Sequence, residues 1–119
     1  NKNIIIIDKY VNHNEFIKCM KKIDIMPILH DANELNNITS GTAYSCVPFQ
    51  TPLILPFGTR YMSNINKYKS FETSKNLNEL AEKIIKISKN YKFYLNNAKL
   101  NSQNLDKIIN RDPLINNII

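Results

Sequence analysis

Three apolar runs without polar alternation divide the first half of the chain, and each predicts a β-strand that is buried on both faces. The strands are expected at residues 4–7 (IIII), 25–29 (IMPIL) and 52–55 (PLIL). Pro27 has no backbone N–H, so the second strand should contain a bulge or lie at a sheet edge. The sequence KSFETS at residues 69–74 predicts a brief fourth strand.

Helical periodicity follows the first two runs. Asn12 is a candidate N-cap with Glu15 three residues later, a pairing typical of a helix start. The apolar stripe of this first helix comprises Phe16, Met20 and Ile23. A second helix is expected over residues 40–49, and Pro48 near its last turn should distort or end it because proline interrupts a helix interior. Its inward-facing residues are expected to be Ala43, Cys46 and Val47.

The second half of the chain is mainly helical. Asn76 and Glu79 repeat the capping pair, and the helix that follows has one apolar face. That face comprises Leu77, Leu80, Ala81, Ile84, Ile85 and Ser88. Helical patterning then continues beyond Asn90 until Asp112 and Pro113 interrupt it.

This alternation of strands and helices predicts an α/β protein with a Rossmann-like parallel sheet and helices on both faces. The first βα unit of such a sheet is not recognisable, so one sheet edge or face should be uncovered. We expect residues 1–95 to form a partial Rossmann-like domain. Residues 96–119 are expected to form a C-terminal helical tail, whose apolar residues should pack against the core or another segment.

Composition narrows the functional classes. The chain of 119 residues has room for one domain, and since it begins with Asn1 we expect it to be a segment of a larger protein. Its longest apolar run is too short for a transmembrane helix.

The net charge of +6 comes from scattered lysines without a nucleic-acid-binding motif, which favours a solvated surface over a nucleic-acid partner. Cys19 and Cys46 lack metal-ligand spacing and predict two reduced thiols of a cytoplasmic protein without a metal site.

The candidate ligand-binding residues are those that follow the predicted strands, because ligands of open parallel sheets bind outside the carboxyl ends of the strands. The residues that this rule selects are His30, Asp31, Asn37, Thr39, Ser40, Gly41, Thr42, Gly58, Thr59 and Arg60. Gly41 would let a phosphate approach the backbone at a helix start, where Ser40 and Thr42 add hydroxyl donors. The alternatives stay open, because Ser-Gly-Thr is also an ordinary cap and turn, and a lone histidine such as His30 is more often structural. No Walker loop, G-x-G-x-x-G, G-x-S-x-G or H-E-x-x-H motif occurs.

The order of these features resembles the C-terminal, donor-binding domain of nucleotide-sugar glycosyltransferases with two Rossmann domains, the GT-B class, and especially its large retaining group. The resemblance covers roughly residues 3–90. It rests on EFIKCMKKIDIMPIL, where the family has a helix running into a strand and a Pro-Ser pair. It also rests on YSCVPFQTPLIL, where the family has EAMACGVPVV, and on the helix NLNELAEKIIKI.

The chain departs from the family pattern at three positions. When Pro52 is set on the proline of the family's Gly-x-Pro-Val, Asn37 and Ser45 fall where the family has its two glutamates. In the family these glutamates hold the donor sugar and the ribose. Asn37 could still hydrogen-bond sugar hydroxyls and Ser45 a ribose, although amide and hydroxyl groups bind more weakly than a carboxylate. Gln50 replaces the glycine.

The resemblance implies a glycosyltransferase of the hexosyltransferase type that transfers a sugar to a glycan or lipid acceptor. The implied donor-binding residues are His30, Asn37, Thr39, Ser40, Gly41, Thr42, Ser45 and Arg60. The donor would be a nucleotide-diphosphate sugar with no further cofactor, and a separate N-terminal domain would supply the acceptor site. Such an enzyme would work in the cytoplasm, at the membrane surface where its acceptor is a lipid. The competing interpretation is a non-catalytic Rossmann-like or flavodoxin-like module that binds a partner.

Overall fold

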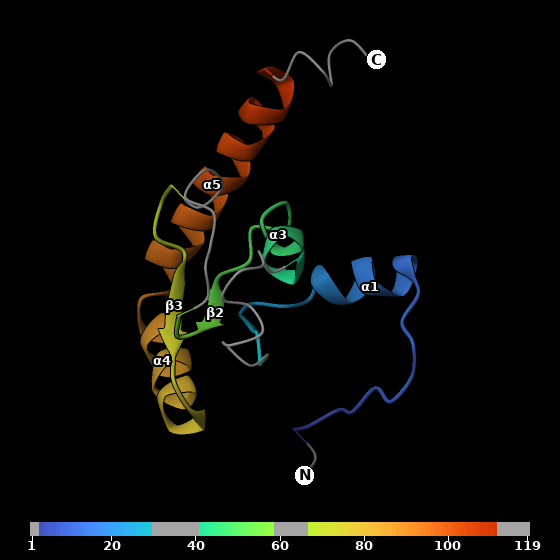
Figure 1. The fold of residues 1–119 in the computed structure, drawn as a ribbon, viewed down its shortest axis with the longest axis vertical. Helices are drawn as coiled ribbons and strands as arrows, with labels where there is room; N and C mark the ends of the chain where they lie inside the picture. The colour runs from blue at the N-terminus through green and yellow to red at the C-terminus, as the bar shows by residue number, and fades with distance from the viewer. Residues whose placement is uncertain (1–2, 30–40, 59–66, 112–119) are drawn as a thin grey trace.

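The computed structural model describes residues 3–29, 41–58 and 67–111, and its centre is a parallel sheet (Figure 1). In chain order the elements are α1 (His13–Met20), β1 (Met26–Pro27), α3 (Gly41–Cys46), β2 (Leu53–Pro56), β3 (Phe71–Ser74), α4 (Leu77–Lys89) and α5 (Tyr91–Arg111). The strands lie in the order β1-β2-β3, and both strand pairs are parallel. Helices α1 and α3 lie on one side of the sheet and α4 and α5 on the other (Figure 1). The predicted α/β class with helices on both faces is confirmed.

The middle strand β2 is buried along its whole length, and β1 forms the edge of the described sheet. The Met26 N–H donates to the Pro52 carbonyl at 2.9 Å, and the Ile28 N–H donates to the Ile54 carbonyl at 2.9 Å. Backbone groups alternate in direction along a strand, so Pro27 has its nitrogen on the outer side of β1. Its missing N–H therefore removes no hydrogen bond between β1 and β2, and the edge position expected from Pro27 is confirmed.

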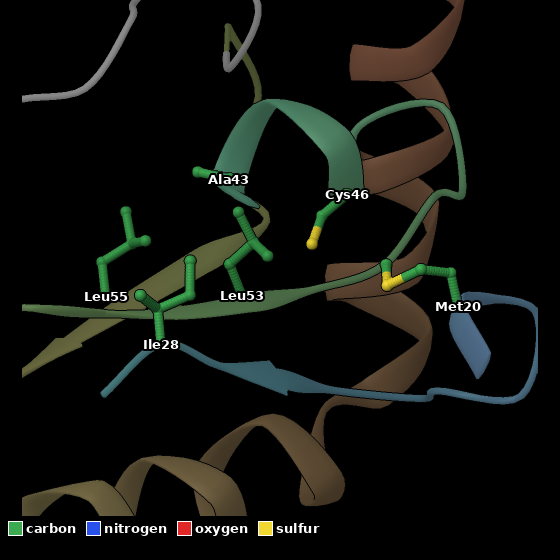
Figure 2. Packing of buried hydrophobic residues seen from close by; sticks show 6 residues of the cluster. All are labelled: Met20, Ile28, Ala43, Cys46, Leu53 and Leu55. Atoms are coloured by element: carbon green, nitrogen blue, oxygen red, sulfur yellow. The ribbon is translucent and has the colours of Figure 1, made fainter. Parts of the chain in front are cut away.

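One face of the sheet packs against α1 and α3 (Figure 2). The buried side chains of this layer are Met20, Ile28, Ala43, Cys46, Leu53 and Leu55. In Figure 2 the Cys46 side chain of α3 points toward Leu53 of β2, and Met20 of α1 closes the cluster at one end. Helix α3 ends before Pro48, and Val47 is also buried, so the predicted inward face of this helix is confirmed.

The other face of the sheet packs against α4 and α5. Ile54 of β2, Ile87 of α4 and Tyr94 of α5 form the buried centre of this layer. Helix α5 runs through residues 95 and 96 without interruption, so no break separates the expected domain from the expected tail within this helix. Residues 112–119 of that tail lie outside the described residues.

The strand expected at residues 4–7 is wrong. These residues belong to no strand in the described structure, and all four isoleucines are exposed, Ile5 to 88%. A strand with apolar side chains on both faces needs a neighbouring strand and a covering layer on each face. The described sheet supplies neither to residues 4–7, so the four side chains form an uncovered apolar surface.

The apolar face expected on α4 is also largely wrong. Leu80 packs toward the sheet, but Leu77, Ala81, Ile84 and Ile85 are exposed. The fully buried residue of this helix is Ile87, which the sequence prediction did not include. The prediction followed the widest apolar stripe, whereas the helix turns a narrower stripe toward β2 and β3.

Candidate functional site

The carboxyl ends of the three parallel strands define one edge of the sheet, which we call the carboxyl edge. Ile28 follows β1, Phe57 follows β2 and Lys75 follows β3. The Cys46 carbonyl at the end of α3 accepts a hydrogen bond from the Thr51 N–H, which places the end of α3 beside the start of β2. Helix α3 therefore begins on the side of the carboxyl edge, as the crossover helix of a parallel pair does.

Three of the eight predicted donor-binding residues lie in α3. Gly41 and Thr42 form its first turn, and the half-buried Ser45 stands one turn later, about 6 Å farther along the helix axis. The structure thus separates Ser45 from the two residues at the helix start. The other five lie outside the described residues: His30, Asn37, Thr39, Ser40 and Arg60.

The helix starts differ in how their backbone N–H groups are used. Asn12 caps α1 by accepting a hydrogen bond from the Glu15 N–H at 2.9 Å. At α4, Asn76 accepts from the Glu79 N–H at 2.9 Å, and Glu79 accepts from the Lys75 N–H at 2.8 Å. Both starts carry an acidic residue in the first turn, which disfavours an anion bound to the backbone N–H groups of that turn. The first turn of α3 has no acidic residue.

Two side chains at the carboxyl edge contact each other from neighbouring strands. The Lys75 Nζ lies over the ring of Phe57, 4.6 Å from its centroid, and the Phe57 N–H donates to the Ser74 carbonyl at 2.8 Å. The Phe57 side chain remains 56% exposed. Gly58 follows with a φ of +86°, a conformation that glycine adopts without strain. Sequence reasoning selected Gly58 but missed Phe57 and Lys75.

A buried carboxylate lies in the layer between the sheet and α5. Glu72 of β3 accepts a hydrogen bond from the Tyr94 hydroxyl, and the Lys86 Nζ lies 2.9 Å from the same oxygen. Lys69 and Lys83 approach the carboxylate at 3.6 and 3.8 Å.

Burial raises the pKa of the Glu72 carboxyl. The hydrogen bonds from Tyr94 and Lys86 and the charges of Lys69 and Lys86 outweigh burial, so the pKa lies below its ordinary value. Burial, together with the hydrogen bond to Glu72 and the charge of Glu72, raises the pKa of Tyr94 to about 12. A glutamate inside the strand FETS was the signal for this cluster, and sequence reasoning did not use it. The cluster faces α4 and α5, so it lies on the opposite face from α3.

A small cavity lies between β2, β3 and α5, at the opposite end of the strands from the carboxyl edge. It holds about 10 Å³, roughly the space for one water molecule. It is lined by Val47, Thr51, Leu53, Ser70, Ala98 and Asn101. The Asn101 side chain is buried and accepts a hydrogen bond from the Tyr68 N–H at 2.8 Å, while its amide donates to the Tyr68 carbonyl at 2.7 Å. This region therefore holds β3 against α5 and leaves no room for a nucleotide.

The two cysteines are not a ligand pair. Both are free thiols, and Cys46, the last residue of α3, is fully buried, and burial raises its pKa from 9.0 to about 11. Across residues 3–29, 41–58 and 67–111, no group of three or more histidine, cysteine or acidic side chains is placed to hold a metal ion.

Comparison with protein-family models, with curated proteins and with solved structures finds no match to this chain. Among the described helices, none is both long enough and apolar enough to cross a membrane.

Proposed function

We propose that this chain binds a nucleotide-diphosphate sugar and forms the donor-binding half of a glycosyltransferase of the two-Rossmann-domain class. The observation that carries the proposal is a convergence at the carboxyl edge. All three described strands are parallel, and the carboxyl ends of β1 and β2 and the first turn of α3 lie at the same edge of the sheet. Open parallel sheets bind nucleotides at this edge.

The local chemistry supports a phosphorylated ligand there. Gly41 opens α3 without a side chain, and no acidic residue stands in the first turn to repel an anion. Lys75 adds a positive charge at the end of β3. The six residues of α3 give it a short dipole, so the backbone N–H groups and the basic side chains would carry most of the attraction.

In this proposal the chain grips the donor, and a second domain supplies the acceptor site and any catalytic base. The acceptor would be a glycan or a lipid, the latter bound at a membrane surface. No acidic residue in the described part of α3 stands where the resembled family holds the ribose, and Ser45 takes that position. The donor would consequently be held mainly through its diphosphate and its base.

Isothermal titration of the full-length protein with uridine and guanosine diphosphates, and with their sugar conjugates, tests the proposal. Binding in the micromolar range, competed by inorganic pyrophosphate, is the expected result. A protein that gives no binding heat with either nucleotide at millimolar concentration contradicts it.

A non-catalytic interaction module is the second candidate. The observation that favours it is the extent of uncovered apolar surface, which includes the four isoleucines at residues 4–7 and a stripe along α4. The stripe comprises Leu77, Ala81, Ile84 and Ile85. Contiguous exposed apolar surface commonly marks an interaction site. Absence of nucleotide binding together with a stable complex of the full-length protein would favour this candidate.

A further inference from the structure

Phe57 and Lys75 stand on the same face and the same edge of the sheet as the start of α3. Leu53 and Leu55 point into the cluster beneath α3, and side chains alternate along a strand, so Phe57 is directed to that face as well. Phe71 of β3 packs against the same cluster. The same alternation directs Lys75 to the α3 face, in agreement with its contact to Phe57.

The strand register sets Phe57 and Lys75 opposite each other. Pro56 pairs with Ser74 at the last position of the β2–β3 ladder, and the Phe57 N–H extends the ladder to the Ser74 carbonyl. The next residues on the two strands are therefore neighbours, and their contact follows from the backbone. The pair lies directly after the last paired position of the two strands, where the Phe57 N–H still bonds to the Ser74 carbonyl.

Phe57 is unusual among the residues of β2 and its continuation. All four residues of β2 are buried, whereas the Phe57 ring, one position later, is 56% exposed. A half-exposed ring with a lysine ammonium over it combines an aromatic surface for a base with a positive charge for a phosphate. Bases stack on such rings with little sequence preference, and ammonium groups bind phosphates as point charges.

We propose that Phe57 is the stacking platform for the nucleobase of a nucleoside diphosphate and that Lys75 binds its phosphates. This inference rests on the proposed function, since it names the two contacts that orient the donor at the carboxyl edge. The Glu79 carboxylate accepts a hydrogen bond from the Lys75 backbone N–H, whereas the Lys75 Nζ lies over the Phe57 ring. Glu79 therefore forms no ion pair with the Lys75 ammonium.

Isothermal titration of the full-length protein with uridine diphosphate, guanosine diphosphate and inorganic pyrophosphate separates base from phosphate contacts. Phe57→Ala should weaken binding of both nucleotides by roughly 5- to 150-fold, the range that corresponds to about 1–3 kcal/mol for one stacked base. It should leave the affinity for pyrophosphate, which has no base, within about twofold of the wild-type value. Phe57→Trp should retain nucleotide binding because the aromatic surface remains, whereas Phe57→Leu should lose it.

Lys75→Gln should weaken nucleotides and pyrophosphate by the same factor and reduce the salt dependence of both. The matched controls are Phe93→Ala on α5, where the ring is 54% exposed, and Lys89→Gln at the end of α4. Both controls should bind all three ligands like the wild type.

The outcomes distinguish the two proposals. Wild-type nucleotide binding that is unchanged in Phe57→Ala, or weakened equally in Phe93→Ala, overturns the platform and leaves the proposed function standing. Equal losses for nucleotides and pyrophosphate in Phe57→Ala also overturn the platform. A wild-type protein that binds neither nucleotide overturns both proposals.

Discussion

The Tyr94 hydroxyl of α5 donates a hydrogen bond to the Glu72 carboxylate of β3, and this bond joins the last helix to the edge of the sheet. Both side chains are buried. The carboxylate would be costly in that layer without its partners, because a buried charge loses its hydration. Lys86 of α4 contacts the same oxygen, so one side chain of β3 holds both helices of this face.

Glu72→Gln should lower the free energy of unfolding by roughly 1–2 kcal/mol near neutral pH, because the charge-assisted hydrogen bonds are lost. The effect stays in this range because the lysines are partly exposed, so solvent weakens their ion pairs with Glu72. The pKa of this carboxyl is lower in the folded protein than its ordinary value of 4.5. Its stabilising contribution is therefore complete above pH 4.5 and is lost as the pH falls through the folded value. Urea denaturation at several pH values should show that the difference in unfolding free energy between wild type and Glu72→Gln becomes smaller in acid.

Glu82→Gln, which removes the same charge from an exposed position on α4, is the control. If the difference in unfolding free energy between wild type and Glu72→Gln stays constant from pH 7 to pH 3, the pKa of the Glu72 carboxyl is not lowered in the folded protein. If the unfolding free energy of Glu72→Gln and of Glu82→Gln depends on pH in the same way, the effect comes from net charge alone.

Asn101→Leu should be among the most destabilising single substitutions on α5, by about 2–4 kcal/mol, because it leaves the Tyr68 N–H and carbonyl without their side-chain partner. The Asn101 amide also donates to the Ser70 hydroxyl at 3.0 Å. Thermal denaturation followed by circular dichroism measures the loss. Asn96→Leu, at an exposed position of the same helix, should change the midpoint little; similar shifts in the two variants would contradict the assigned role of Asn101.

Gly41→Val should weaken binding of a nucleotide sugar by on the order of 10-fold or more, about 1.4 kcal/mol, if a diphosphate lies against the first turn of α3. Ser40→Ala should cost less affinity, since only a hydroxyl contact worth about 0.5–1.5 kcal/mol is removed. An ordinary helix cap reverses this order, because Ser40→Ala would then lower stability and neither change would alter affinity. Titration and thermal denaturation of both variants distinguish the two cases.

Cys46 should react slowly with thiol reagents, because the thiolate is the reactive form and burial raises its pKa to about 11. Cys19 is only half-buried. In native buffer near pH 8, a colorimetric thiol assay should detect Cys19 first and Cys46 only as the protein unfolds. Cys19→Ser should abolish the early phase; a Cys19→Ser protein that still reacts within minutes would place Cys46 in contact with solvent.

Ile5→Lys should leave the midpoint of thermal unfolding unchanged, because the side chain is 88% exposed and has no packing to lose. It should reduce binding of an apolar dye and raise solubility, since it interrupts the apolar surface of residues 4–7. Tyr10→Lys, at another exposed apolar position of the same segment, is the control. A clear loss of stability in Ile5→Lys would mean that residues 4–7 are packed in the full-length protein.

Sequence reasoning reached most of the fold because local signals determine most of it. Asn12 and Asn76 cap their helices by hydrogen bonds to the residue three positions later, and Pro48 limits α3 locally because proline interrupts a helix. The burial of β2 follows from its continuous apolar run. These features need no knowledge of distant parts of the chain.

The failures arise where a distant partner decides. Residues 4–7 have the composition of a buried strand, but no neighbour in the described sheet pairs with them. Helix α4 has an apolar stripe wider than its contact with the sheet, and composition alone does not say which part is used. The Phe57–Lys75 pair depends on the register between β2 and β3, which periodicity within either strand does not contain. The predicted residues of the loops, such as His30 and Arg60, lie outside the described residues.

Asn97 and Asn101 stand one helical turn apart on α5 and bind successive residues just before β3. The Asn97 amide donates to the Lys69 carbonyl at 2.7 Å, and Asn101 holds both backbone groups of Tyr68. A slip of β3 by one residue would turn its side chains to the opposite faces and carry the Glu72 charge into the apolar layer under α3. The two amides hold the segment before β3 against α5, and so keep the Glu72 charge on the face where Tyr94 and Lys86 contact it.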